Sequence, residues 1–139
     1  MQKIYLDDLR TPNDTSWIIC RNYDEFVATV SSIGLSGIEV ISLDHDLGKT
    51  AIEEYFRNVQ TRNVIDYDNI VEKTGYDCAK WIVDLSVETD TPLPLIYTHS
   101  ANPVGCVNIM AYINNYLEHC GMPPTCERVK IPHSVSEEE

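Results

Sequence analysis

Short runs of β-branched and aromatic residues alternate along this chain with longer runs whose apolar residues recur every three or four positions. The short runs lie at 3–6, 17–20, 37–43, 94–98 and 127–131, and turn-forming residues bound them, as is typical of strands. The helical spacing of apolar residues occurs at 22–34, 75–85 and 102–121. Strands separated by helices predict an α/β domain with a mainly parallel sheet.

The segment from 49 to 74 interrupts this alternation. It is polar, and Ile52, Tyr55, Phe56 and Val59 have the spacing of one short helix, with Glu53 and Arg57 placed four residues apart as an ion pair. A connection this long predicts an insertion. The sequence leaves open whether the insertion is a lid or specificity loop, or only a surface excursion.

Length and composition predict one domain. The 139 residues, 43% of them hydrophobic, suffice for one sizeable core, so we assign residues 1–133 to a single domain and 134–139 to an acidic tail. The formal charge of -12 argues against broad nucleic-acid binding, because phosphate backbones are repelled unless a metal ion or a local basic cluster intervenes.

The cysteines and the apolar runs indicate a compartment. Five cysteines without CxxC spacing, and a charged start that does not resemble a signal peptide, predict free thiols in a reducing cytoplasm. The longest apolar stretches have the length of strands, so no membrane span is expected.

Polar residues follow three of the predicted strands at the point where each strand ends. The parallel strands of a sheet deliver their carboxyl ends to one edge, where ligands bind, so these residues are expected to meet. They are Asp7 and Asp8 after the first strand, Asp44, His45 and Asp46 after the third, and His99, Ser100 and Asn102 after the fourth.

Crowded carboxylates repel one another unless a cation neutralises them, and oxygen ligands of this kind suit Mg²⁺ or Mn²⁺. Asp7, Asp8 and Asp44 are therefore the predicted metal ligands. The alternative is that they are turn residues whose carboxylates accept backbone N–H bonds. Asp46 either takes part in the chemistry of the site or shapes the turn before Gly48.

The two histidines are candidate proton carriers. His45 and His99, with Asp46, form the predicted catalytic group, since imidazole titrates near neutrality; a structural role for each histidine is the alternative.

A phosphate group is the expected ligand beside these residues. Ser100 precedes a helix start at Asn102, where backbone N–H groups favour an anion, although an ordinary capping role is equally open. Arg10 and Lys130 are the cations that the sequence places nearest to such an anion, unless each is simply a surface charge.

Several of these positions resemble response-regulator receiver domains. The matching residues are the acidic pair Asp7 and Asp8, the central Asp44, Ser100 followed by Ala101, and Lys130 near Pro132. The resemblance implies a flavodoxin-like three-layer sandwich with a mainly parallel five-stranded sheet. It also implies Mg²⁺ at the three acids, a phosphoryl group accepted by Asp44, and Lys130 paired with that phosphate.

The chain departs from an ordinary receiver at both ends. The gap between 6 and 17 is too short for a crossover helix with its loops, so the edge strand at 17–20 is expected to be rearranged or antiparallel. No helical pattern follows 127–131, so the last helix is predicted to be missing.

The motifs "YLDDLRTP", "SLDHDLG", "TGYD" and "HSANP" are more similar to cyclic-phosphate processing receiver domains, small proteins of bacteria and phages. That resemblance implies action on a cyclic or nucleotide phosphate in defence or counter-defence. It also implies that His45, Asp46, His99 and Ser100 adapt a phosphate-accepting switch to bind or hydrolyse a phosphodiester.

Three functions remain open at this point. The favoured one is a metal-dependent phosphoesterase that hydrolyses a cyclic nucleotide or a related small phosphate-containing molecule. The second is a single-domain receiver in which Asp44 accepts a phosphoryl group, and the missing last helix counts against it. The third is a non-catalytic protein that sequesters a nucleotide or contacts a protein partner.

Overall fold

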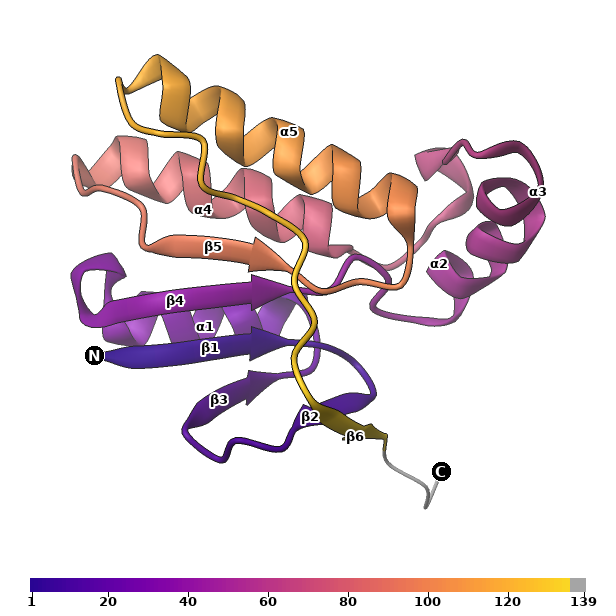
Figure 1. The fold of residues 1–139 in the computed structure, drawn as a ribbon, viewed down its shortest axis with the longest axis horizontal. Coiled ribbons are helices and arrows are strands. Elements are labelled where there is room, and N and C mark those ends of the chain that lie inside the picture. Colours follow the sequence, from indigo (N-terminus) through magenta and orange to yellow (C-terminus); the bar gives the residue numbers. More distant parts are fainter. Residues whose placement is uncertain (136–139) are drawn as a thin grey trace.

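A computed structural model describes residues 1–135 and has a sheet of four parallel strands at its centre (Figure 1). The strand order is β3-β1-β4-β5, which places the two long strands in the middle. The strands are β1 (Gln2–Leu6), β3 (Trp17–Cys20), β4 (Ile38–Leu43) and β5 (Leu95–Thr98). The α/β class with a mainly parallel sheet is thereby confirmed, and the edge strand β3 is parallel to β1 rather than antiparallel.

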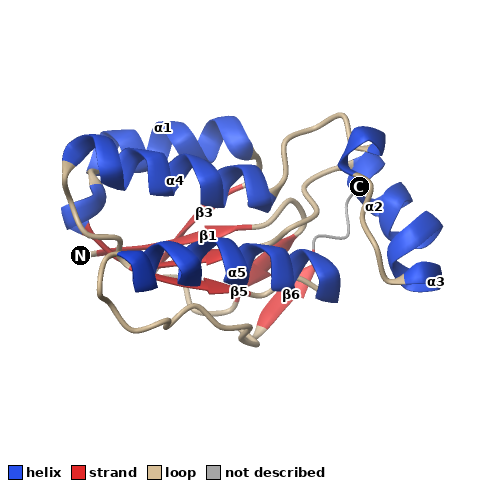
Figure 2. Ribbon diagram, turned by 90° about the horizontal axis from the view of Figure 1, so that it is seen from above, coloured by secondary structure: helices blue, strands red, loops and turns tan. Residues whose placement is uncertain are grey.

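Two helices pack against one face of this sheet, a third lies beside them along its β5 edge, and together they bury the core (Figures 1 and 2). They are α1 (Tyr23–Ile33), α4 (Gly75–Thr89) and α5 (Pro103–His119); the short turn η1 (Leu35–Gly37) links α1 to β4. The sheet contributes alternate residues such as Ile4, Leu6 and Ile41 to a cluster that includes Phe26 and Ile109. Burial of this apolar surface is the main driving force for folding.

The opposite face of the sheet has no helix over it in residues 1–135, so the expected three-layer sandwich has only two layers over most of its area. The connection from β1 to β3 contains the short strand β2 (Arg10–Pro12) in place of a crossover helix. In place of a last helix there is β6 (His133–Val135), which pairs with β2 in antiparallel fashion. Residues 136–139 of the predicted acidic tail lie outside the described residues.

The expectation of a fifth strand at 127–131 is wrong. Only one bridge forms there, between Thr98 and Arg128, in the direction parallel to β5. Beyond it the chain crosses the carboxyl end of the sheet to reach β2 (Figure 1). A segment that must pair with β2 on the far side of the molecule cannot run along β5 for a full strand.

The insertion folds into a helical excursion beside the carboxyl edge of the sheet (Figure 1). It contains α2 (Lys49–Glu54), the wide helical turn η2 (Tyr55–Val59), α3 (Gln60–Arg62) and η3 (Tyr67–Asn69). Buried Glu54 accepts hydrogen bonds from the side chains of Asn58 at 2.8 Å and Asn69 at 2.7 Å, so one carboxylate ties the excursion together. Arg57 pairs with Glu54 at 3.1 Å, not with Glu53 as the spacing predicted.

The thiols are free in this fold, as expected. Cys20, Cys78, Cys106 and Cys126 are buried, and Cys120 is exposed. None of the helices in residues 1–135 has the length and apolarity to cross a membrane.

Candidate functional site

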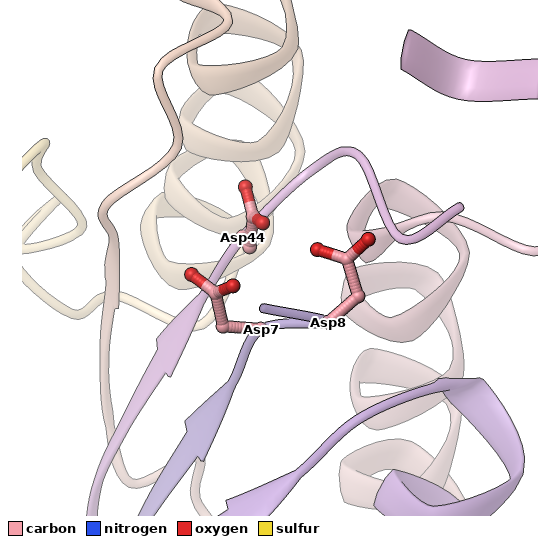
Figure 3. Close-up of side chains that lie close together, drawn as sticks. All are labelled: Asp7, Asp8 and Asp44. Atoms are coloured by element: carbon pink, nitrogen blue, oxygen red, sulfur yellow. The ribbon is translucent and has the colours of Figure 1, made fainter. Parts of the chain in front are cut away.

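The carboxyl ends of β1 and β4 bring three aspartates together, as predicted (Figure 3). Asp7 and Asp8 follow β1, Asp44 follows β4, and one carboxylate oxygen of each lies within 4.8 Å of the other two. Asp7 is 1% and Asp44 5% exposed, and Asp8 is half-buried. Three negative charges at this spacing and depth require compensation.

Part of that compensation comes from Arg10. Its Nε donates to Oδ2 of Asp7 at 2.7 Å, and its Nη2 lies 3.3 Å from Oδ1 of Asp44. The short strand β2 holds Arg10 in this position, directly after the turn that follows β1. One guanidinium therefore serves two of the three carboxylates, and the site retains an excess of negative charge.

The pKa values of the three carboxyl groups reflect this imbalance. Burial favours the neutral form of Asp7, but hydrogen bonds from His99 and from the backbone N–H groups of Arg10 and Leu9 outweigh burial and lower its pKa. Burial and the charge on Asp7 raise the pKa of Asp44 to about 8 and that of Asp8 to about 6. Of the three carboxyl groups, Asp44 therefore has the highest pKa and holds its proton at pH 7.

The donor set fits a divalent cation of the oxygen-preferring kind. All three donors are carboxylates. Burial and the charge on Asp7 raise the pKa values of Asp44 and Asp8, and a nearby positive charge would reverse that shift. Mg²⁺ and Mn²⁺ prefer such ligands. Asp7, Asp8 and Asp44 are thus the residues that would hold the ion.

His45 and Asp46 form a second polar group next to the acids. The His45 Nδ1 proton is donated to Oδ1 of Asp46 at 2.6 Å, and the hydroxyl of Tyr67 lies 2.9 Å from Nε2. Asn108 donates to the same hydroxyl at 3.0 Å. His45 is 0% exposed, so it orients Asp46 and cannot itself touch a ligand, whereas Asp46 is only half-buried.

Two glycines allow this group to pack so closely. A Cβ on Gly105 of α5 would lie 2.4 Å from Cγ of His45, and a Cβ on Gly75 of α4 would lie 1.8 Å from the backbone oxygen of Asp44. Both distances are far below van der Waals contact. The starts of α4 and α5 therefore press directly on the turn that presents Asp44 and Asp46.

His99 is bound on both ring nitrogens. Its Nε2 lies 3.1 Å from Oδ2 of Asp7, and its Nδ1 lies 2.7 Å from the hydroxyl of Ser42. The ring stacks on Tyr5 at 4.3 Å, and burial lowers its pKa in spite of the contact with Asp7. The N–H on Nε2 thus donates to the Asp7 carboxylate and holds it in position.

Ser100 and Asn102 lie between the two polar groups. The hydroxyl of Ser100 accepts the backbone N–H of Asn102 at 3.1 Å, and the Asn102 side-chain oxygen accepts the N–H of Gly105 at 3.0 Å to cap α5. The Asn102 amide nitrogen donates to Asp46 at 3.2 Å. These two residues therefore hold the turn and Asp46 in place.

A pocket of about 330 Å³ opens above the acids. Asp7, Asp8, Asp44 and Asp46 form its floor together with Arg10, Ser100 and Asn102. The insertion supplies an apolar wall that our sequence reasoning did not assign to the site, made of Ile52, Tyr55 and Phe56. The signal available was the helical spacing of these residues beside the acidic turn.

Lys130 does not line this pocket. It lines a separate cleft of about 850 Å³ on the uncovered side of the sheet, with His99 and Arg128. Arg128 is not among the residues predicted for the site from the sequence, although it stands two residues from Lys130 on the predicted strand. The predicted phosphate-binding residues are thus divided between two neighbouring hollows.

Comparison with known proteins adds one finding. The family model of the cyclic-phosphate processing receiver domain matches residues 2–115, a range that includes the three acids, the insertion and most of α5. Separate searches of curated proteins and of solved structures returned no match.

Proposed function

The chain belongs to the family of cyclic-phosphate processing receiver domains, and within it we propose a metal-dependent phosphoesterase that hydrolyses a cyclic or linear nucleotide phosphate. The proposed cofactor is Mg²⁺ or Mn²⁺. The observation that carries this proposal is the cluster of three carboxylate oxygens within 4.8 Å of one another on the floor of a pocket with an aromatic wall.

The chain supplies a positioned base beside the acids. Asp46 lines the pocket. Its carboxylate accepts hydrogen bonds from His45 Nδ1 at 2.6 Å and from the Asn102 amide nitrogen at 3.2 Å. A carboxylate held in this way can accept the proton of an attacking water. His45 is then a positioning residue, and His99 supports Asp7 rather than the substrate.

Hydrolysis adds one water molecule to the ester. When bound, the divalent cation supplies positive charge against the phosphoryl group and lowers the pKa of a water molecule. The water oxygen forms a new P–O bond, one ester P–O bond breaks, and the leaving oxygen takes up a proton. Arg10, which lines the pocket, is the cation of this chain that faces the phosphoryl oxygens.

The apolar wall supports a nucleotide rather than a bare phosphate ester. Tyr55 is half-buried and Phe56 is 57% exposed, and both lie against the acidic floor. Exposed aromatic side chains beside a phosphate site are suited to stacking on a base. The insertion would thereby act as the specificity element of the site.

The test is turnover of a panel of cyclic mono-, di- and trinucleotides by the purified protein with Mg²⁺ or Mn²⁺, following both substrate loss and binding. Asp44→Asn and Asp46→Asn are the informative variants, and Asp84→Asn, the same change on an exposed position of α4, is the matched control. Metal-dependent turnover that both informative variants lose and the control keeps is the expected result.

The other outcomes identify the alternative functions. Binding without turnover would favour a sequestering protein. Absence of both, together with labelling of Asp44 by a small-molecule phosphodonor, would favour a phospho-accepting receiver. Against that alternative, the receiver lysine of the resemblance, Lys130, lines a different hollow from Asp44.

A further inference from the structure

The uncovered face of the sheet carries a large cleft next to the acidic pocket. Residues 128–133, here named the strap, cross the end of the sheet (Figure 1). The strap forms one wall of this cleft, and Tyr5 and His99 line it from the sheet. Its volume of about 850 Å³ is well above that of the acidic pocket, about 330 Å³. Cavities of this size hold ligands as large as a nucleotide.

Positively charged side chains line this strap cleft, whereas the molecule as a whole is negatively charged. Arg10, Arg128 and Lys130 line it, three of only ten Lys and Arg in a chain of net charge -12, and no Asp or Glu is among the lining residues in 1–135. Neither Arg128 nor Lys130 lies within 4.0 Å of a carboxylate oxygen from residues 1–135. Arg10 is paired with Asp7 and Asp44, so Arg128 and Lys130 are the two cations of the cleft that favour an anionic ligand.

One of these cations is held in place by the protein. Nη2 of Arg128 donates to the backbone oxygen of Ser100, a residue that lines both hollows, at 3.0 Å. The remaining guanidinium donors are left for a ligand, and a planar guanidinium is suited to bind phosphate through two hydrogen bonds.

The strap cleft and the acidic pocket adjoin each other. Arg10, Ser100 and Ala101 line both, so one ligand can enter both at once. Val129 and Ile131 give the strap cleft apolar walls as well as charge, as expected for a site that takes a sugar or base together with a phosphate.

We propose that the strap cleft binds a second phosphate of the substrate, joined through a nucleoside to the phosphate held at the acidic pocket. The substrate class is then a short oligonucleotide, cyclic or linear, rather than a mononucleotide. This inference rests on the proposed function, which places the reacting phosphate at Asp7, Asp8 and Asp44. The net charge of -12 limits the nucleotide to a short one.

The test compares ligands with one and two phosphates by isothermal titration calorimetry in Mg²⁺. The probes are adenosine and guanosine monophosphates and the matching linear and cyclic dinucleotides, the latter as hydrolysis-resistant phosphorothioates. Lys130→Gln is the main variant, because Lys130 has no hydrogen bond or ion pair with residues 1–135 that its loss would break. Lys80→Gln, on α4 of the opposite face, is the matched control.

We expect a dinucleotide to bind at least about ten-fold more tightly than the monophosphate, and Lys130→Gln to remove about ten-fold of that affinity without changing monophosphate binding. The linear and cyclic probes identify the form of the nucleotide. Equal affinity for both classes of probe, equal weakening by Lys130→Gln and Lys80→Gln, or no binding of any dinucleotide would overturn the inference.

The same titrations separate this inference from the proposed function. Dinucleotide binding that depends on Lys130 but is insensitive to Mg²⁺ and to Asp44→Asn would uphold the strap cleft and contradict the metal-dependent site. Monophosphate binding that needs Mg²⁺ and Asp44, with no gain from a second phosphate, would uphold the site and reject the cleft.

Discussion

Replacement of Asp44 by asparagine is expected to stabilise the protein when no divalent cation is present. Burial and the Asp7 carboxylate raise the pKa of Asp44 from 3.8 to about 8. At pH 7 the folded state keeps the proton while the unfolded chain releases it. At about 1.4 kcal/mol per pKa unit this difference costs the folded state about 4 kcal/mol. Asparagine imitates the neutral acid and removes the cost.

The destabilisation caused by Asp44 depends on pH. Below the unfolded pKa of 3.8 both states hold the proton, so Asp44 contributes nothing to the pH dependence. Between 3.8 and about 8 the folded state binds more protons than the unfolded state, so wild-type stability falls as the pH rises. The difference between Asp44→Asn and wild type should therefore grow from about 2 kcal/mol at pH 5 to about 4 kcal/mol at pH 7.

Urea unfolding of both proteins in EDTA at pH 5 and pH 7 measures this difference. Mg²⁺ should then raise the stability of the wild type and have little effect on the variant, because the ion binds the folded state through the carboxylate that is missing. Asp84→Asn is the control for loss of a surface charge. A variant less stable than wild type at pH 7, or a difference independent of pH, would refute the electrostatic reasoning.

Three further substitutions test other contacts. Phe56→Ala should raise KM for a nucleotide about ten-fold with kcat nearly unchanged, because Phe56 is 57% exposed at the pocket wall and is placed to stack on a base. Val87→Ala on α4 is the control. An unchanged KM would show that Phe56 does not stack on the nucleotide. Gly105→Ala should lower the free energy of unfolding by about 1–3 kcal/mol, since its Cβ would lie 2.4 Å from His45; unaltered urea unfolding would contradict that packing. Tyr67→Phe should cost about 1–3 kcal/mol of stability, because His45 loses its hydrogen-bond partner on Nε2. It should also lower kcat at constant KM, because His45 then holds Asp46 less firmly. A kcat equal to wild type would show that Tyr67 only anchors the insertion.

The sequence predicted those parts of the fold that depend on local pattern. The runs at 17–20 and 94–98 became strands because β-branched and aromatic residues there face a buried layer, and Asn102 begins α5 as its capping position indicated. The run at 127–131 also contains β-branched residues, Val129 and Ile131, but it forms only one bridge, because pairing of β6 with β2 draws the chain away from β5. Long-range pairing of this kind leaves no mark in a local pattern.

In the candidate site, too, the sequence predicted what depends on local pattern and not what depends on long-range packing. The meeting of Asp7, Asp8 and Asp44 follows from strand parallelism, which the sequence indicates. The burial of His45 could not be predicted, since it depends on how closely Gly105 of α5 approaches. Nor could the sequence show that Arg10 joins two of the acids while Lys130 lies in a separate cleft, because both placements follow from the path of β2 and the strap.

The most direct test of the metal-dependent site is the position of Mn²⁺ in crystals of the protein, located by its anomalous scattering. The account predicts one strong peak coordinated by the carboxylates of Asp7, Asp8 and Asp44, and its disappearance in crystals of Asp44→Asn. A map without a peak at these residues, in which Arg10 still joins Asp7 and Asp44, would contradict the metal site and the phosphoesterase activity proposed from it.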